Sequence, residues 1–135
     1  DLEIVTQFFF EAEPFIKWDA LLDTIGVTLP VRVGFPGPAT FKTLLNFGLM
    51  SGVGNSLNFL KKNSNKIGDL LVKTSNDKLL MELVTASKYS KIGRPNGFHC
   101  YPFGGFEKTC YWLTAIQNGD FIVENEKLVF HKKIF

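Results

Sequence analysis

The chain opens with a hydrophobic run over residues 2–10, in which both alternating sets of positions are apolar. Such a run is typical of a strand covered on both faces, as in the parallel sheets of α/β proteins. Gln7 interrupts it near its carboxyl end. A buried amide needs hydrogen-bond partners, and parallel α/β folds bind their ligands where the strands end. Gln7 is therefore either a structural amide, bonded to a neighbouring strand or loop, or a ligand contact.

Helical and extended patterns then alternate along the chain. Acidic residues and Pro14 open a helix that Gly26 is placed to end. Thr40 is a plausible N-cap for the helix that follows it. The other expected elements are strands over 29–35 and 97–103, helices over 41–50 and 106–118, a short helical piece at 56–60, a helix opening at 75–77, and a small hairpin within 121–129.

This order of elements is the pattern of a parallel sheet with right-handed crossovers. Three strands cannot close a barrel, and alone they would leave two apolar edges. A (β/α)₈ barrel needs about eight strands and ~250 residues. Because Asp1 directly precedes a buried-type strand, we expect the C-terminal part of a TIM barrel, about three βα units, rather than a small three-layer fold. Residues 1–135 would be this partial α/β domain, with a C-terminal hairpin and tail over 119–135.

Composition narrows the class of protein further. The chain has 135 residues, of which 45% are hydrophobic and 21% charged, as in a globular domain. The net charge is +2 and the basic residues are scattered, which argues against nucleic acid as a partner. Residues 43–60 carry no charge, but their Asn, Gly and Ser residues make a poor membrane span. Cys100 and Cys110 form no CxxC pair, so we expect reduced thiols and a cytoplasmic protein.

Phe47 is the oddity of the helix over 41–50. At 100° per residue it lies on a side shared with Thr43 and Met50, away from the stripe that should pack on the sheet. That stripe consists of Phe41, Leu44, Leu45 and Gly48. Phe47 is then a surface residue, a residue covered by a later segment, or a platform for a flat aromatic ligand.

Four segments together resemble one enzyme family, the methylenetetrahydrofolate reductases. They occur in the order and roughly the spacing of the last three barrel strands of that family, and the resemblance extends to about Asn118. The first segment is the most specific of the four. They are Thr6-Gln7-Phe8-Phe9-Phe10, Phe35-Pro36-Gly37-Pro38, the run from Phe41 to Phe47, and Gly97-Phe98-His99-Cys100-Tyr101. The turn at 34–38 and the stretch at 103–106 resemble a divergent bacterial branch of the family.

The resemblance implies a flavin-dependent (β/α)₈ oxidoreductase of one-carbon and methionine metabolism. Such an enzyme reduces 5,10-methylenetetrahydrofolate to 5-methyltetrahydrofolate with NADH or NADPH, and its cofactor is FAD. The catalytic acid and most FAD contacts would come from strands before Asp1, so this chain would hold no catalytic residue and would be inactive alone. Tetrahydrofolate is the implied partner, and a homo-oligomer is left open.

The resemblance also assigns site residues. Gln7 matches a glutamine that contacts the pterin or the nicotinamide, and Phe47 matches a phenylalanine that stacks on the folate or the nicotinamide nucleotide. Thr43 stands where better-known members have a glutamine that contacts folate. Gly105 stands where they have an arginine, with Lys108 as the nearest cation. The folate tail would then be bound differently here.

The remaining polar residues leave alternatives open. The hydroxyl of Tyr101 could reach substrate or merely the next loop, and His99 reads as a satisfied core histidine. No Cys/His cluster has the spacing of metal ligands. Two other functions therefore stay open: a folate-binding homologue with different one-carbon chemistry, and a small α/β interaction module in which Gln7 and Phe47 are structural.

Overall fold

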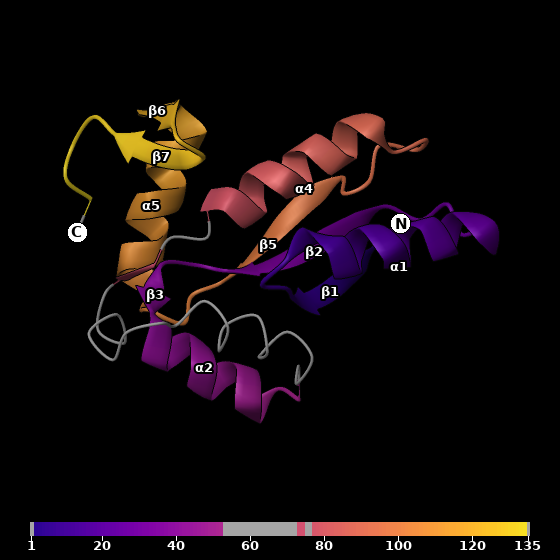
Figure 1. Cartoon of the computed structure of the whole chain (residues 1–135), viewed down its shortest axis with the longest axis horizontal. Coiled ribbons are helices and arrows are strands. Elements are labelled where there is room, and N and C mark those ends of the chain that lie inside the picture. The colour runs from indigo at the N-terminus through magenta and orange to yellow at the C-terminus, as the bar shows by residue number, and fades with distance from the viewer. Residues whose placement is uncertain (1, 53–72, 75–76, 135) are drawn as a thin grey trace.

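A parallel sheet of three strands forms the centre of the molecule, in the order β1-β2-β5 (Figure 1). The computed structural model describes residues 2–52, 73–74 and 77–134, so the expected piece at 56–60 lies outside the described residues. Both strand pairs are parallel, as expected, and a helix follows each strand. The strands are β1 (Ile4–Phe8), β2 (Val31–Pro36) and β5 (Gly97–Tyr101), and the helices are α1 (Ala12–Thr24), α4 (Asp77–Tyr89) and α5 (Phe106–Asn118).

Smaller elements lie at the ends of this sheet. A two-residue strand pair, β3 (Ala39–Thr40) with β4 (Lys73–Thr74), is antiparallel, and the helix α2 (Phe41–Met50) begins where β3 ends. The expected C-terminal hairpin is present as β6 (Phe121–Glu124) and β7 (Lys127–Phe130), and in Figure 1 it lies over one end of α5, beside the start of α4. Its two turn residues have φ of 49° and 61°, the left-handed values of a tight hairpin turn.

The helices α1, α4 and α5 all cover the same face of the sheet. Their apolar side chains pack on the middle strand, where Val31 and Val33 are fully buried. The helix residues of this core include Phe15, Leu83 and Trp112. Full burial of each such side chain contributes about 1.5–3 kcal/mol. This face, which we call the helix-covered face, therefore holds the main hydrophobic core.

A second apolar cluster lies at the carboxyl ends of the strands. It joins the end of β1 to the first turns of α2, and Tyr101 and Phe103 pack against it from the end of β5. Its buried members are Phe8, Phe10, Ala39, Phe41 and Leu44. The edge of the ring of Phe8 meets that of Phe103, with centroids 4.8 Å apart. This cluster fixes α2 beside the strand ends, where ligands bind in parallel α/β folds.

The opposite face of the sheet, which we call the uncovered face, carries small and polar side chains. Arg32, Gly34, Gly97 and His99 lie on it, and His99 is exposed, so its expected place in a core is wrong. The expectation that both faces of the first strand are covered is also wrong, since Val5 is 48% exposed. The physical reason is that β1 is an outer strand, and the cluster that contains α2 covers only its carboxyl end, at Phe8.

The pairing of β1 with β2 is irregular at Gln7. The register shifts between Val5 and Phe8, and the hydroxyl of Thr6 replaces a backbone acceptor by taking the N–H of Gly34 at 2.8 Å. The hydroxyl of Tyr101 donates to the Thr6 carbonyl at 3.1 Å, and so links the two outer strands past the middle one. Gly34 leaves room for this link because it has no side chain.

Candidate functional site at the carboxyl ends of the strands

The start of α2 places two hydroxyls beside the end of β2. Thr40 is the N-cap, as expected, and its side-chain oxygen accepts the backbone N–H of Thr43 at 3.2 Å. The hydroxyl of Thr43 lies 2.8 Å from that of Thr40. An N-cap of this kind fixes where the helix begins. The side chain of Thr43 is therefore held at a defined position, facing the connection between β5 and α5.

Phe47 lies two turns further along α2 and is half-buried. Its ring stacks on that of Phe103, with centroids 4.3 Å apart and planes at 15°. Phe103 also stacks on Tyr101, with centroids 5.6 Å apart and planes at 25°. Phe103 thus sits between the two rings, and one face of Phe47 is taken. One face of the Phe47 ring is therefore covered by a later segment, which was one of the three possibilities that the sequence left open. A ligand could stack only on the other face.

The remaining expected site residues differ in their surroundings. Tyr101 points to the β1 backbone, so its hydroxyl meets a neighbouring strand rather than the next loop. Gln7 is exposed, which corrects its expected burial, and its side-chain amide has no hydrogen bond among the described residues. The structure thus gathers Thr43, Phe47 and Tyr101 around Phe103, and places Gln7 on the adjoining strand with its amide free.

A small cavity of about 140 Å³ lies beside this aromatic stack. One wall is the chain from Pro38 to Thr43, and the other contains Phe103, Gly104 and Lys108. The two walls touch at Gly104, where a Cβ atom would lie only 1.9 Å from the carbonyl oxygen of Pro38. Only glycine permits this approach, so Gly104 is a structural requirement of the cavity.

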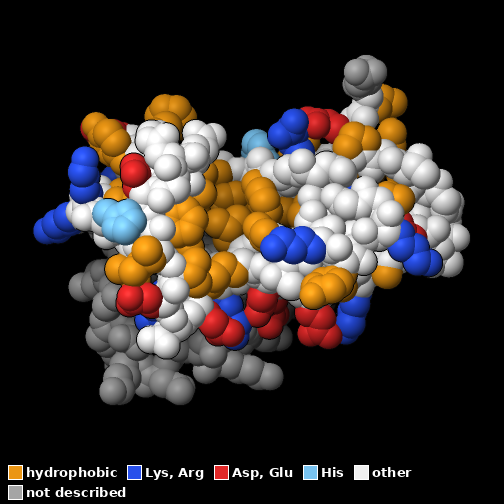
Figure 2. All heavy atoms as spheres, turned by 90° about the horizontal axis from the view of Figure 1, so that it is seen from above, with side chains coloured by type: hydrophobic (Ala, Val, Ile, Leu, Met, Phe, Trp, Pro, Cys, Tyr) orange, Lys and Arg blue, Asp and Glu red, His pale blue; other side chains and the backbone are white. Residues whose placement is uncertain are grey.

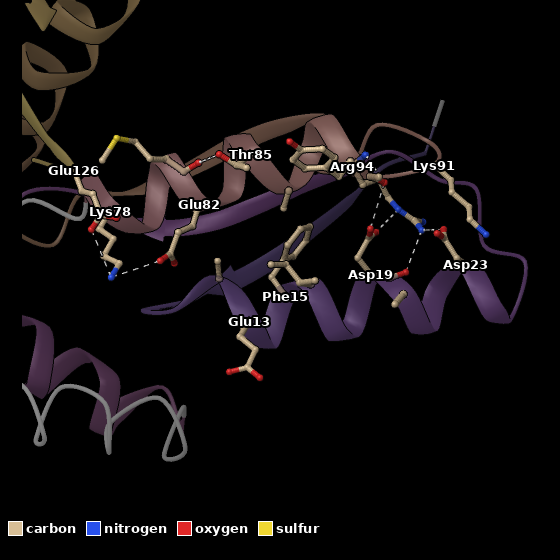
Figure 3. Close-up of a pocket in the computed structure, with 17 residues that line it drawn as sticks. Glu13, Phe15, Asp19, Asp23, Lys78, Glu82, Thr85, Lys91, Arg94 and Glu126 are labelled. Carbon is tan, nitrogen blue, oxygen red and sulfur yellow. Dashed lines mark hydrogen bonds and ion pairs between the residues drawn. The ribbon is translucent and has the colours of Figure 1, made fainter. Parts of the chain in front are cut away.

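A larger hollow of about 810 Å³ lies elsewhere, between α1 and α4 (Figure 3). Figure 3 shows Phe15 pointing from α1 into it, and Arg94 reaching down toward Asp19 and Asp23. The guanidinium of Arg94 is fully buried, forms ion pairs with both carboxylates, and donates to the carbonyl of Val27 at 2.8 Å. Arg94 therefore ties the C-terminal half of α1 to the segment that enters β5.

The charges around this larger hollow are mostly paired. Burial raises the pKa of Asp19, and the neighbouring Arg94 opposes this effect without cancelling it. Lys78 lies within 4 Å of both Glu82 and Glu126, at 3.8 and 3.7 Å. Carboxylates engaged in ion pairs with Arg94 and Lys78 stabilise the fold. We therefore place the candidate functional site at the strand ends, where the hollow is smaller but the resemblance and the geometry coincide.

The described residues offer few features that would bind a metal ion or a charged polymer. Among the described residues, no group of three or more His, Cys, Asp or Glu side chains could hold a metal ion. No helix in that part of the chain is both long and apolar enough to cross a membrane. On the face seen in Figure 2, Lys and Arg side chains are scattered at the margins around a hydrophobic middle. No protein-family model matches the chain.

Sequence reasoning missed two features of this region and one remote from it. The β3–β4 pair was missed because two-residue strands leave no periodicity. The role of Phe103 was missed because a residue after a strand has no pattern that names its stacking partner. The ion pairs of Arg94 were missed as well, although two aspartates four apart on one helix, Asp19 and Asp23, could have suggested a shared cation.

Proposed function

We propose that this chain is the C-terminal portion of a (β/α)₈ barrel, in a flavin-dependent cytoplasmic oxidoreductase that reduces 5,10-methylenetetrahydrofolate with NADH or NADPH. One observation carries the proposal: Thr43 and Phe47 on α2 and Tyr101 at the end of β5 gather around Phe103, at the carboxyl ends of adjacent parallel strands. That edge is where enzymes of the barrel fold place their active sites. Thr43 and Phe47 are also residues that the resemblance in sequence assigns to the folate site.

The sheet itself is consistent with a barrel portion. Within the described residues, β1 and β5 each pair on one side only. Unpaired edges of apolar strands favour further pairing, and a closed barrel removes such edges. The helices α1, α4 and α5 all lie on one face, and the other face carries glycines and exposed polar side chains such as Arg32 and His99. In a barrel the helix-covered face would be the outside and the uncovered face the interior.

The residues present fit the binding of a flat substrate better than they fit the binding of FAD. The free amide of Gln7 offers one acceptor and two donors, which suit the polar edge of a pterin or a nicotinamide. The open face of Phe47 offers a stacking surface. A bound flavin would supply the hydride chemistry, with most of its contacts on strands outside this chain. The residues named here would bind and orient the substrate.

A folate-binding homologue with other one-carbon chemistry is the second candidate. It is favoured by Gly105, which has φ of 112° and therefore does not readily accept the arginine of better-known members. Thr43 departs from the same pattern, because its hydroxyl is engaged with Thr40. The two candidates share the binding site and differ in whether a reduction follows.

The test is steady-state kinetics of the purified full-length protein, with flavin content measured in parallel. Gln7→Ala should lower kcat/KM for folate reduction by about 5- to 150-fold, the equivalent of about 1–3 kcal/mol in a buried hydrogen-bonded complex. Phe47→Ala should raise the KM for folate or for the nicotinamide by about 2- to 12-fold, through loss of a stacking surface worth about 0.5–1.5 kcal/mol. Flavin content should not change in either variant.

Matched controls come from exposed residues of the same types of element. Gln117→Ala removes an exposed amide from α5, and Met50→Ala removes an 81% exposed side chain from the end of α2. Both should keep wild-type kinetics. If Gln7→Ala and Phe47→Ala match these controls, the two residues are structural and the site assignment fails. Folate binding without any reduction would instead favour the second candidate.

A further inference from the structure

We propose that the small cavity beside Phe103 binds the anionic group of the substrate, through the ammonium of Lys108 and a threonine hydroxyl. The cavity lies between the connection from β2 to α2 and the connection from β5 to α5. Only the naming of the occupant as the carboxylate tail of a folate rests on the proposed function. The preference for an anion follows from the cavity itself.

The size of the cavity suits a single charged group. A water molecule takes about 30 Å³ in the liquid, so about 140 Å³ holds a carboxylate or a phosphate with a few attached atoms. A whole drug-sized ligand needs roughly 300–1,000 Å³. The two walls meet in a backbone contact, where a Cβ on Gly104 would lie 1.9 Å from the carbonyl oxygen of Pro38. The cavity therefore exists before a ligand binds.

The polar groups of the cavity are mainly donors. The oxygen of Thr40 accepts the backbone N–H of Thr43, and the two hydroxyls share one further hydrogen bond. Whichever hydroxyl donates in that bond, the other keeps a hydrogen for a third acceptor. Lys108 adds an exposed ammonium that forms no ion pair in the described part of the chain. No Asp or Glu occurs among the described residues that line the cavity, so these residues favour an acceptor with negative charge.

Phe103 connects this cavity to the aromatic site. It lines the cavity and also stacks on Phe47. A ring bound on the other face of Phe47 would lie on one side of this pair of rings, and an anion beside Lys108 would lie on the other side. A ligand that fills both sites has a flat ring system and an acidic tail. The φ of 112° at Gly105 disfavours a side chain at that position. Lys108 would therefore supply the cation that binds the acidic tail.

The test is a titration of the purified protein with glutarate and, separately, with inorganic phosphate, followed by amide chemical shifts in NMR. Saturable shifts are expected at Thr43, Gly104 and Lys108. Lys108→Ala should weaken glutarate binding about tenfold, because it removes the one cation found among the described residues that line the cavity. Thr43→Val keeps the shape and the backbone N–H but removes a hydroxyl, and should weaken binding about threefold.

Lys42→Ala is the matched control, because Lys42 is an exposed lysine on the same helix as Thr43 but not in the cavity. It should weaken binding less than twofold. An equal loss in Lys42→Ala and Lys108→Ala would mean general attraction by surface charge, and would overturn the site, as would the absence of shifts at the three amides with both probes. Tighter binding of phosphate than of glutarate would support the anion site and assign it to a nucleotide phosphate rather than a folate tail.

The same variants separate this inference from the proposed function. If glutarate binds as expected but the protein binds and reduces no folate, the anion site stands and the proposed function fails. If folate is reduced and Lys108→Ala leaves the KM unchanged for substrates with and without the glutamate tail, the proposed function stands and the anion site is overturned. Support for both requires that Lys108→Ala raise the KM only for the substrate that carries the tail.

Discussion

The two faces of the sheet differ in almost every physical respect. On the helix-covered face, Val31, Val33 and Trp112 are at most 1% exposed, and three helices pack on the middle strand. On the uncovered face, glycines alternate with Arg32 and His99, and a hydroxyl stands in for a backbone acceptor. The first face provides most of the apolar burial that stabilises the fold, whereas the second carries glycines and polar groups.

This difference suggests that the helix-covered face is selected for stability and the uncovered face for binding. A face that needed only to be buried would carry Val, Ile and Leu, as parallel strands usually do. The positions on the uncovered face instead have no Cβ, as at Gly34 and Gly97, or a polar side chain. Glycine in a strand weakens it and often marks a place where another backbone or a ligand approaches closely. The uncovered face is therefore the one that a ligand would meet.

The largest expected contrast is between one residue from each face. Trp112→Ala should lower the free energy of unfolding by about 3–5 kcal/mol, because Trp112 is 1% exposed and fills the core under α5. His99→Ala, on the uncovered face, should change it by less than about 0.5 kcal/mol. Urea denaturation of the purified protein measures both. Similar losses would show that the uncovered face is also part of a packed core.

A second contrast concerns Cys100, which lies on the helix-covered face. Burial, with a smaller effect from the nearby Cys110, raises the pKa of the Cys100 thiol to about 12. An ordinary thiol has a pKa of about 8.5, so at pH 8 the reactive thiolate of Cys100 is scarcer by roughly three orders of magnitude. Iodoacetamide should therefore modify Cys100 very slowly in the folded protein, and the rate should keep rising with pH up to about pH 12.

The control for Cys100 is the same reaction in denaturant, located by mass spectrometry. There the thiol should react at an ordinary rate, with a pH dependence that levels off near 8.5. The sign for stability follows from the same shift: the contribution of the protonated thiol is complete below the unfolded pKa and is lost as the pH rises toward the folded one. Rapid modification of Cys100 at pH 8 in the folded protein would show that this face opens readily.

The helix-covered face was largely predictable from the sequence, for a clear physical reason. Apolar residues at helical spacing predicted α5 at its observed bounds, and Gly119, with φ of 70°, ends that helix where the pattern placed it. Strands were predicted too long, over 2–10 rather than Ile4–Phe8 for β1. Hydrophobic residues continue past the last ladder bond, and pattern alone does not show where pairing stops.

The uncovered face and the site were predicted only in part. Gln7 and Phe47 stood out from the pattern and were then assigned by the resemblance, and Tyr101 came from its place near a strand end. The structure places Thr43, Phe47 and Tyr101 together. The exposure of Gln7 and His99 was missed, because an apolar run reads as buried on both faces whether or not a partner covers it. The cavity was also missed, since it depends on the approach of two loops at Gly104. Such approaches join segments distant in sequence and leave no local pattern.

The finest test of the uncovered face compares its two glycines. In Gly34→Ala the new Cβ would lie 2.6 Å from the carbonyl oxygen of Gln7 and 2.7 Å from that of Thr6. Both atoms belong to the backbone, so β1 would have to move away from β2 and would strain the bond from the Gly34 N–H to the Thr6 hydroxyl. We expect a loss of about 1–3 kcal/mol in the free energy of unfolding.

Gly97→Ala, on the same face, should behave differently. Its Cβ would lie 3.0 Å from an Nη1 atom of Arg32, at the far end of a flexible side chain that can turn aside. The turn would disturb only the half-exposed ion pair of Arg32 with Glu3, worth at most about 1 kcal/mol. Alanine also restricts the unfolded chain, which offsets about 0.4–1 kcal/mol. The net change in the free energy of unfolding should be near zero in urea denaturation, at an unchanged m-value. A loss in Gly97→Ala as large as that in Gly34→Ala would show that both glycines face backbone. The close approach of β1 to β2 would then not be what requires Gly34.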